Sequence, residues 1–234
     1  MSRTAVVFGV GPGLGMSMAH RFGREGYDVV LLSRREERHA GFVAELAEAG
    51  VKARAFALDL KDRVRLSAVL DEIGDVDVVY WGPGATDLDG LPPEITSTTA
   101  DEVRVAMDWL YPAVDVVQRV LPGLVERGGG LVFAGGLSAV RPMPVLGALA
   151  LSTAALRNYV LTLNAALAEK GVYVGTLTIG GVIARGDIHG VVLGDPVRFG
   201  NLAERTLDPD EIAETAWRMF VERDRAEEVF SVLG

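Results

Sequence analysis

Short apolar runs rich in β-branched residues alternate with longer segments of helical periodicity along this chain. Thr4–Gly9, Asp28–Ser33 and Lys52–Leu58 have the length and composition of buried strands. The segments between them, Pro12–Gly26 and Arg38–Gly50, repeat apolar residues at helical spacing and end in glycine. Strands joined by helices of this length form parallel sheets, and right-handed crossovers place helices on both faces. The alternation therefore predicts a doubly wound α/β fold.

The same alternation continues to the end of the chain. The further predicted elements are a helix at Val64–Gly74, a strand at Val76–Trp81, a helical region at Thr99–Arg127, a strand at Leu131–Ala134, a helical region at Val145–Lys170, a strand at Val172–Ile179, a helix at Pro209–Asp224 and a short strand at Glu228–Val232. Residues 180–207 follow the sixth strand without clear periodicity, and we interpret them as a substrate-side loop or lid. With no internal repeat or linker, residues 1–234 are predicted to form a single domain.

Composition excludes several classes of function. The net charge of −9 argues against a nucleic-acid partner, since such proteins bind phosphates through Lys and Arg. The chain has no cysteine, and its three histidines lie far apart, so no metal site is predicted. The apolar stretch from Val145 to Leu156 is too short to span a bilayer, and the N-terminus lacks the apolar core of a signal peptide. We therefore expect a cytoplasmic protein without a membrane partner.

A glycine-rich turn joins the first predicted strand to the first helix. Gly9, Gly11, Gly13 and Gly15 occur within seven residues, with Leu14 at the start of the helix. Glycine lets the backbone approach a diphosphate closely, and a helix N-terminus stabilises its charge. The spacing is G-x-x-x-G-x-G, and its place inside a βαβ unit predicts that these five residues bind a dinucleotide. The alternative is a tight turn without a ligand.

The end of the second strand carries Ser33, Arg34 and Arg35. Sites for NAD commonly have an acid at this point, which accepts hydrogen bonds from the ribose hydroxyls, whereas arginine accommodates the 2′-phosphate of NADP. Guanidinium groups suit that phosphate because they are planar and permanently charged. The three residues therefore predict NADP(H) in preference to NAD(H). The alternative is that both arginines are solvated surface charges.

Several of these motifs together resemble the short-chain dehydrogenase/reductase family. The matching segments are Phe8–Gly15, Ser33-Arg34, Leu58-Asp59-Leu60, Leu121-Pro122 and Leu207–Ala213, and they extend over nearly the whole chain. The resemblance implies a single Rossmann-type domain that binds a nicotinamide dinucleotide. It also implies that Asp59, followed by Leu60, lies beside the adenine ring.

Two turns of this chain depart from the pattern of that family. Its Asn-Asn-Ala-Gly after the fourth strand reads Trp81-Gly82-Pro83-Gly84 here, so we expect Gly82, Pro83 and Gly84 to contribute backbone contacts to the cofactor, with a plain turn as the alternative. Its Pro-Gly-x-x-x-Thr after the sixth strand reads Gly180–Arg185. The resemblance implies that Gly181 and Ile183 offer backbone groups to the nicotinamide carboxamide. Arg185 is expected to point to the diphosphate or to form a surface ion pair.

The positions that supply catalysis in the family hold other residues here. The resemblance aligns Leu149 with the proton-donating Tyr, Thr153 with the Lys that assists it, and Gly136 with the Ser that polarises the carbonyl. Leucine exchanges no proton and threonine carries no charge. Ser138, two residues after Gly136, is the candidate replacement for the lost acid, and the alternative is a loop hydroxyl bonded to the backbone.

Three hypotheses of function follow. The first is an oxidoreductase that transfers hydride between NADP(H) and an apolar carbonyl or enone, because the family has this activity. The second is a non-catalytic NADP(H) sensor or scaffold protein, and the third is an isomerase, cyclase or dehydratase on the same scaffold. The apolar helical regions Thr99–Arg127 and Val145–Lys170 predict a homodimer or homotetramer.

Overall fold

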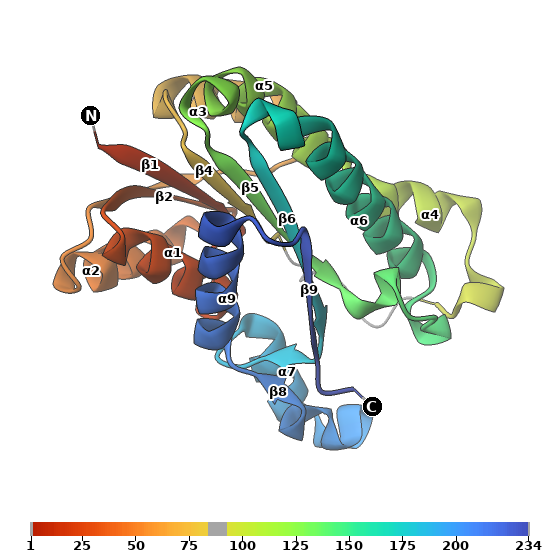
Figure 1. Cartoon of the computed structure of the whole chain (residues 1–234). Helices are drawn as coiled ribbons and strands as arrows, with labels where there is room; N and C mark the ends of the chain where they lie inside the picture. Colours follow the sequence, from red (N-terminus) through yellow and green to blue (C-terminus); the bar gives the residue numbers. More distant parts are fainter. Residues whose placement is uncertain (1, 84–92, 234) are drawn as a thin grey trace.

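A computed structural model of the chain describes residues 2–83 and 93–233. Within these residues one parallel sheet runs through the molecule, in the order β3-β2-β1-β4-β5-β6-β9 (Figure 1). Its strands are β1 (Arg3–Phe8), β2 (Tyr27–Ser33), β3 (Ala53–Ala57), β4 (Val78–Trp81), β5 (Gly130–Gly136), β6 (Tyr173–Gly180) and β9 (Glu227–Ser231). This order is that of the doubly wound Rossmann fold, and the fold class predicted from the sequence is confirmed.

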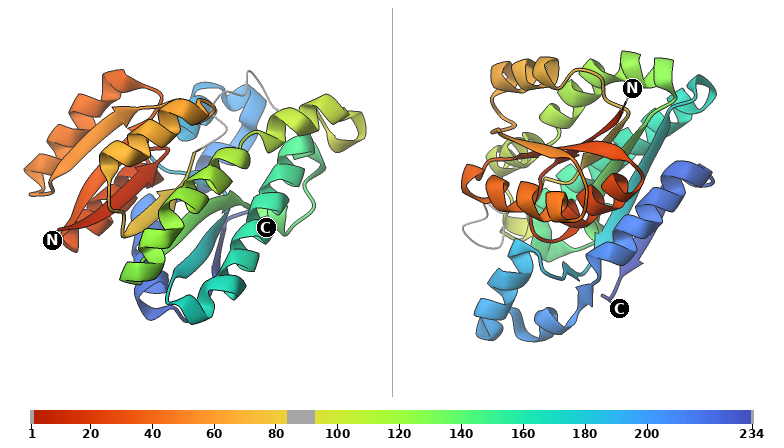
Figure 2. Two further views of the ribbon diagram at one scale, coloured as in Figure 1. Left: turned by 90° about the horizontal axis from the view of Figure 1, so that it is seen from above. Right: turned by 90° about the vertical axis from the view of Figure 1, so that its left-hand side faces the viewer.

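Helices cover both faces of the sheet (Figures 1 and 2). One layer contains α1 (Leu14–Arg24), α2 (His39–Glu48) and α9 (Pro209–Glu222). The other contains α3 (Arg63–Ile73), α5 (Tyr111–Arg127) and α6 (Gly147–Leu167), with α4 (Ala100–Met107) packed against α6. Because each face is covered, the central strands are buried on both sides and consist of continuous apolar runs.

The register brings the ends of three central strands to one edge of the sheet. Phe8, the last residue of β1, pairs with Leu32 of β2 and with Trp81 of β4, and Trp81 pairs in turn with Phe133 of β5. The turns that follow these strands therefore emerge side by side. This edge is where ligands bind in open parallel sheets.

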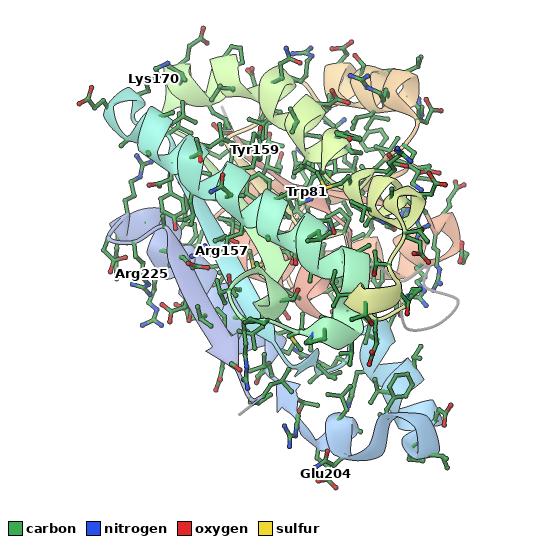
Figure 3. All side chains as sticks on the ribbon, turned by 90° about the vertical axis from the view of Figure 1, so that its right-hand side faces the viewer. Trp81, Arg157, Tyr159, Lys170, Glu204 and Arg225 are labelled. Carbon is green, nitrogen blue, oxygen red and sulfur yellow. The ribbon has the colours of Figure 1, made fainter. Side chains whose placement is uncertain are left out.

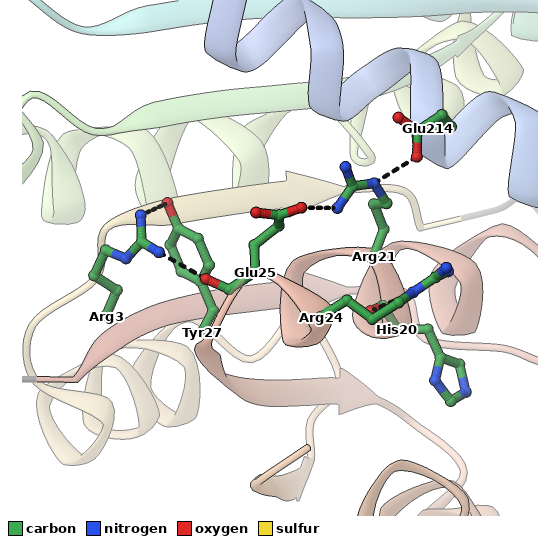
Figure 4. Close-up of polar contacts among 7 residues, drawn as sticks. All are labelled: Arg3, His20, Arg21, Arg24, Glu25, Tyr27 and Glu214. Carbon is green, nitrogen blue, oxygen red and sulfur yellow. Dashed lines mark hydrogen bonds and ion pairs between the residues drawn. The ribbon is translucent and has the colours of Figure 1, made fainter. Parts of the chain in front are cut away.

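Ionic and aromatic contacts join α1 to α9, and Figure 4 shows the ionic contacts of Arg21. Arg21 of α1 donates to Glu25 at 2.6 Å and to Glu214 of α9 at 2.7 Å, and its guanidinium lies 4.8 Å from the ring centre of Trp217. Phe22 packs edge-on against the same Trp217 ring. The helix that follows the glycine turn is thereby fixed to the C-terminal helix.

The structure corrects two of the predicted segments. The region 99–127 is two helices, because α4 ends at Met107 and α5 begins at Tyr111 with Pro112 in its first turn, where a residue without an N–H group is tolerated. Residues 180–207 are ordered rather than irregular. They contain β7 (Val182–Ile183), α7 (Asp187–Gly194), α8 (Pro196–Phe199) and β8 (Thr206–Leu207), and β7 pairs with β8.

One described stretch, Pro144–Lys170, is long and apolar enough to cross a membrane by length and composition alone. It contains α6, which packs against β5 and β6 and forms the near face of the molecule in Figure 3. Core helices of globular proteins have the same length and composition, so this property is weak evidence for a membrane span. The expected cytoplasmic location stays a prediction.

Candidate functional site

Close packing explains two of the glycines in the turn between β1 and α1. Gly9 has a φ of +80°, and a Cβ on it would lie 2.6 Å from the backbone nitrogen of Pro83. A Cβ on Gly15 would lie 2.8 Å from the Cα of Val10. The helix then begins after Gly13 with no side-chain cap and no acid in its first turn. The glycines thus let the turn pack closely against neighbouring backbone, and an uncapped helix N-terminus with free N–H groups is a feature that receives a phosphate group.

Two cavities meet above this turn. The larger, of about 390 Å³, contains Gly9, Gly11, Gly13, Leu14 and Gly15 among its lining residues. The smaller, of about 110 Å³, extends from the turn toward the end of β2. All five glycine-turn residues predicted from the sequence thus line one cavity, and a continuous row of lining residues connects it to the second.

The smaller cavity gathers the residues predicted to hold the adenosine end of a dinucleotide. These are Ser33, Arg34, Arg35, Asp59 and Leu60. The Asp59 carboxylate accepts the backbone N–H of Lys61 at 3.0 Å, which shapes the turn after β3. Arg34 and Arg35 are exposed at the mouth of the cavity.

Ser33 is already engaged within the protein. Its Oγ lies 2.8 Å from Nε2 of His39, a buried residue at the start of α2. Burial lowers the pKa of His39, so this imidazole is neutral at pH 7 and its ring nitrogens act as one donor and one acceptor. A hydroxyl has one donor and two acceptor sites, so Ser33 keeps hydrogen-bonding capacity beside its bond to His39.

Sequence reasoning missed Arg38 and Asp187 in this region. The sequence predicts Arg38 as the first residue of a helix, whereas the structure places it in the turn before α2, where it lines the smaller cavity with Arg34 and Arg35. Its Nη1 donates to both carboxylate oxygens of Asp187, at 2.7 and 2.9 Å. Asp187 is the first residue of α7, inside the predicted lid, and nothing local in the sequence links it to Arg38.

The turn after β4 is shaped by Tyr80. A Cβ on Gly82 would overlap the phenol ring of Tyr80, so glycine is required here while the ring keeps this position. Gly82 and Pro83 line the larger cavity together with Tyr80, whereas Gly84 lies outside the described residues. Burial raises the pKa of Tyr80 well above its usual range, so the phenol stays protonated. Sequence reasoning did not select this residue, because its strand reads as plain core.

Gly136, Leu149 and Thr153 meet in the larger cavity, as the resemblance requires. A Cβ on Gly136 would lie 3.6 Å from the Thr153 methyl group and 3.6 Å from the Ser138 hydroxyl. Around them the lining is mainly apolar, and includes Trp81, Trp109, Leu110, Leu156, Ile179, Val182 and Ile188. The three side-chain positions are therefore grouped at one point, but none of these residues carries an acid or a cation.

Ser138 is tied to Thr153. The two hydroxyl oxygens lie 2.8 Å apart, and the Thr153 hydroxyl lies 2.9 Å from the carbonyl of Leu149 and 3.1 Å from that of Ala150. When Thr153 donates to either carbonyl, Ser138 must donate to Thr153. The Ser138 hydroxyl proton is then engaged in the hydrogen bond to Thr153, and Ser138 can only accept hydrogen bonds from other groups.

The segment after β6 brings Gly181 and Ile183 to the same cavity, but Arg185 turns away from it. The carbonyl of Ile183 accepts the N–H of Gly186 at 3.2 Å. Arg185 has a φ of +66°, and its guanidinium lies 2.7 Å from the carboxylate of Asp210 in the first turn of α9. Burial alone would raise the pKa of Asp210, but hydrogen bonds from Ser17 and Arg185 lower it overall. Of the two roles expected for Arg185, the structure shows the ion pair.

No group of three or more His, Asp or Glu side chains that could hold a metal ion occurs in residues 2–83 and 93–233. The site therefore consists of a backbone cradle, a cluster of arginines and an apolar chamber. Its polar side chains are concentrated at the end near β2.

Comparisons with known proteins agree with this geometry. A dehydrogenase/reductase SDR family member 2 from Homo sapiens is 27% identical over 207 residues, which cover 87% of this chain and 72% of that protein. An L-sorbose reductase from Gluconobacter frateurii, solved with NADPH and L-sorbose, has a TM-score of 0.83 at 20% identity and covers 100% of this chain and 95% of its own. An NADPH-bound short chain oxidoreductase from Pseudomonas aeruginosa, reported as containing an atypical catalytic center, has a TM-score of 0.84 at 21% identity, with 98% and 95% covered.

The structural likenesses establish the fold, and the family model establishes the membership. The model for short chain dehydrogenases matches residues 3–187, which is most of the chain. The chain therefore belongs to the short-chain dehydrogenase/reductase family of oxidoreductases.

Proposed function

We propose that this protein is an NADP(H)-dependent oxidoreductase acting on an apolar carbonyl or enone compound. The observation that carries the proposal is the continuous row from the glycine turn to Arg34 and Arg35, which fits a diphosphate at one end and a 2′-phosphate at the other. The solved relative from Gluconobacter frateurii, which holds NADPH, supports the same choice of cofactor.

The reduced cofactor supplies a hydride, and with one proton from solvent a carbonyl becomes an alcohol while the nicotinamide is oxidised. The protein itself contributes position and exclusion of water. Gly9, Gly13 and Gly15 let the turn pack closely against neighbouring backbone, and the uncapped N-terminus of α1 would stabilise the charge of a diphosphate. Trp81, Trp109 and Leu149 present apolar surface to the substrate and restrict water around the reacting carbon.

The missing acid favours a conjugated substrate over a simple ketone. General acid catalysis contributes about 10²–10⁴-fold. Among the described residues that line this chamber, the hydroxyl groups are those of Tyr80, Ser152 and Thr153, and the one carboxyl group is that of Asp187, which is paired with Arg38. Reduction of an enone requires protonation at carbon, and solvent can supply that proton. Residues 180–207 are proposed to close over the substrate, since Ile188 of α7 lines the chamber.

Calorimetry with NADP⁺ and NAD⁺ tests the cofactor assignment. Arg34→Ala is expected to weaken NADP⁺ binding about 10–100-fold, because a charge-assisted contact to phosphate contributes about 1.5–3 kcal/mol, and to change NAD⁺ binding little. Arg65→Ala on α3 removes an exposed arginine outside both cavities and is the control. Absence of binding by the wild type to either dinucleotide would refute the proposal.

A second function, NADP(H) binding without turnover, is favoured by the replacement of the three catalytic positions by Gly136, Leu149 and Thr153. Consumption of NADPH, followed by absorbance over a panel of ketones, aldehydes and enones, separates the two. Any substrate-dependent loss of NADPH excludes the sensor or scaffold role. Tight binding with no consumption over the panel favours it.

We also propose that two copies associate through the layer of α5 and α6. Large apolar side chains are exposed along this layer, at Tyr111, Val114 and Val125 of α5 and at Leu151 of α6. Exposed apolar side chains favour burial against a second copy. Light scattering of the purified protein should give the mass of a dimer or tetramer, and a monomer mass at micromolar concentration would contradict this proposal.

A further inference from the structure

Asp187 lies at the junction of the two cavities. Five described residues line both of them, namely Gly9, Gly11, Pro83, Trp109 and Asp187, and Asp187 alone among these carries a charge. A dinucleotide that occupied both cavities would have to pass this junction with its phosphate groups. A carboxylate is the side chain least suited to that place, because like charges repel most strongly where water is scarce.

The carboxylate is held in this position from two directions. On one side Arg38 donates to both of its oxygens at 2.7 and 2.9 Å, and Arg35 lies 3.9 Å from it. On the other side, two residues earlier in the chain, Arg185 is anchored to Asp210. The first turn of α7 is thereby fastened across the cleft to the segment that follows β2.

The same carboxylate stands over the glycine turn. Its Oδ2 would lie 3.8 Å from a Cβ on Gly11, and the backbone of Gly186 would lie 3.0 Å from a Cβ on Gly13. Asp187 thus presents oxygen atoms to Arg38 and to the space above the turn, as a phosphate group would. A carboxylate is planar and a phosphate is tetrahedral, but each presents two oxygen atoms that a guanidinium group can bind through two hydrogen bonds.

We propose that Asp187 competes with the cofactor phosphates for Arg38. The ion pair between Asp187 and Arg38 closes the cleft until a phosphate group of NADP(H) replaces the carboxylate as the partner of the arginine. The proposal rests on the NADP(H) binding proposed above. It assigns to Asp187 a role in cofactor affinity and selectivity, and to Arg38 the role of a phosphate ligand that is occupied in the absence of cofactor.

The size of the effect follows from the fraction of open molecules. If the ion pair is closed in about nine molecules of ten, the apparent affinity for cofactor is reduced about tenfold. Asp187→Asn removes the charge with little change in shape, so it should strengthen NADP⁺ binding about tenfold. The gain for NAD⁺ should be smaller if Arg38 receives the 2′-phosphate, and equal if it receives the diphosphate.

Two variants that break the same ion pair separate competition from a structural role. Asp187→Asn should strengthen NADP⁺ binding, whereas Arg38→Gln should weaken it, because the latter also removes the phosphate ligand. A pair that only stabilised the fold would give losses in both variants. Asp115→Asn is the control, since it removes a carboxylate bound through two hydrogen bonds to Arg63 outside both cavities, and it should leave the affinity unchanged.

The binding is measured by calorimetry, and hydrogen exchange of the free protein reports on the closure itself. Amides of α7 should exchange about tenfold faster in both cleft variants than in the wild type or in Asp115→Asn. Unchanged or weaker NADP⁺ binding by Asp187→Asn, with binding intact in the wild type, would overturn the competition alone. Absence of dinucleotide binding in wild type and variant together would overturn the proposed function as well.

Discussion

The two ends of the cleft differ in how tightly the fold specifies them. The phosphate end consists of the glycine turn with Arg34, Arg35 and Arg38. Close packing excludes side chains at glycines of the turn, and the three arginines supply positive charge. At the reaction end, formed by Gly136, Leu149 and Thr153, the residues are small or apolar and space remains around them. The fold therefore combines a phosphate end whose residues are set by close packing and charge with a reaction end whose residues are set by neither.

The largest effect is expected from restoring the reaction end. A variant with Gly136→Ser, Leu149→Tyr and Thr153→Lys should increase NADPH-dependent carbonyl reduction about 10²–10⁴-fold, because it returns a proton donor and a cation to positions that already converge. Gly136 has a φ of −103°, which any residue adopts. Initial rates over a panel of aldehydes and ketones measure the gain.

The control for this variant carries side chains of similar size without acid or charge, namely Gly136→Ser with Leu149→Phe and Thr153→Met. Its rate should stay near that of the wild type. Equal rates in the two variants would show that the positions 136, 149 and 153 do not converge on a substrate, so the reaction end would lack the geometry for catalysis as well as the chemistry.

The next effect concerns the phosphate end. Gly9→Ala should lower the free energy of unfolding by about 3 kcal/mol, because the left-handed backbone costs about 1–2 kcal/mol and the new Cβ collides with the backbone at Pro83. Gly26→Ala is the matched control, since Gly26 has the same φ of +80° with no atom within 4 Å of the added Cβ. Urea unfolding should show a loss of about 1–2 kcal/mol there. Equal losses in both variants would contradict a steric role for Gly9.

A smaller effect concerns the anchoring of α6, which carries the reaction end. Arg157 of α6 donates to both carboxylate oxygens of Glu227 in β9, and Thr178 donates to the same carboxylate at 2.6 Å. Arg157 is labelled in Figure 3. The hydrogen bond from Arg157 lowers the pKa of Glu227 below its usual 4.5, against the opposing effect of burial.

Because the folded pKa is depressed, the stabilisation by Glu227 is complete above about pH 4.5 and is lost as the pH falls through the folded value. Glu227→Gln should therefore lower the free energy of unfolding by about 1–2 kcal/mol at pH 7, with a difference that shrinks below pH 4.5. Urea unfolding at a series of pH values measures it. A difference that stays constant down to pH 3 would show that the charge of Glu227 contributes nothing.

The sequence predicts most of the fold because each buried strand is a short run of apolar residues that can be recognised locally. The buried runs around Val6, Val30 and Val79 are readable without knowledge of their neighbours. The break between α4 and α5 was missed although Pro112 marks it, because the apolar pattern continues on both sides. The short elements within 180–207 were missed because strands of two residues and a helix containing Gly190 and Gly194 have no periodicity to detect.

The site divides in the same way. The glycine turn is one short segment and Arg34 directly follows a strand, so both stand out in the sequence. Arg38 and Asp187 are 149 residues apart, and only the folded chain joins them. Ser138 was selected for its place near Gly136, but sequence alone could not show that Thr153 holds its hydroxyl. Long-range pairs of this kind have no local pattern, so their chemistry becomes visible only with coordinates.

The close packing of Tyr80 on Gly82 constrains the order in which this turn can change by single substitutions. While the phenol keeps its present position, a Cβ at position 82 collides with it, so the asparagine that the family resemblance implies for this turn is inaccessible. A smaller residue at position 80 must come first, and only then does position 82 become permissive. The two positions are therefore epistatic, and attempts to rebuild the turn one residue at a time will succeed in one order and fail in the other.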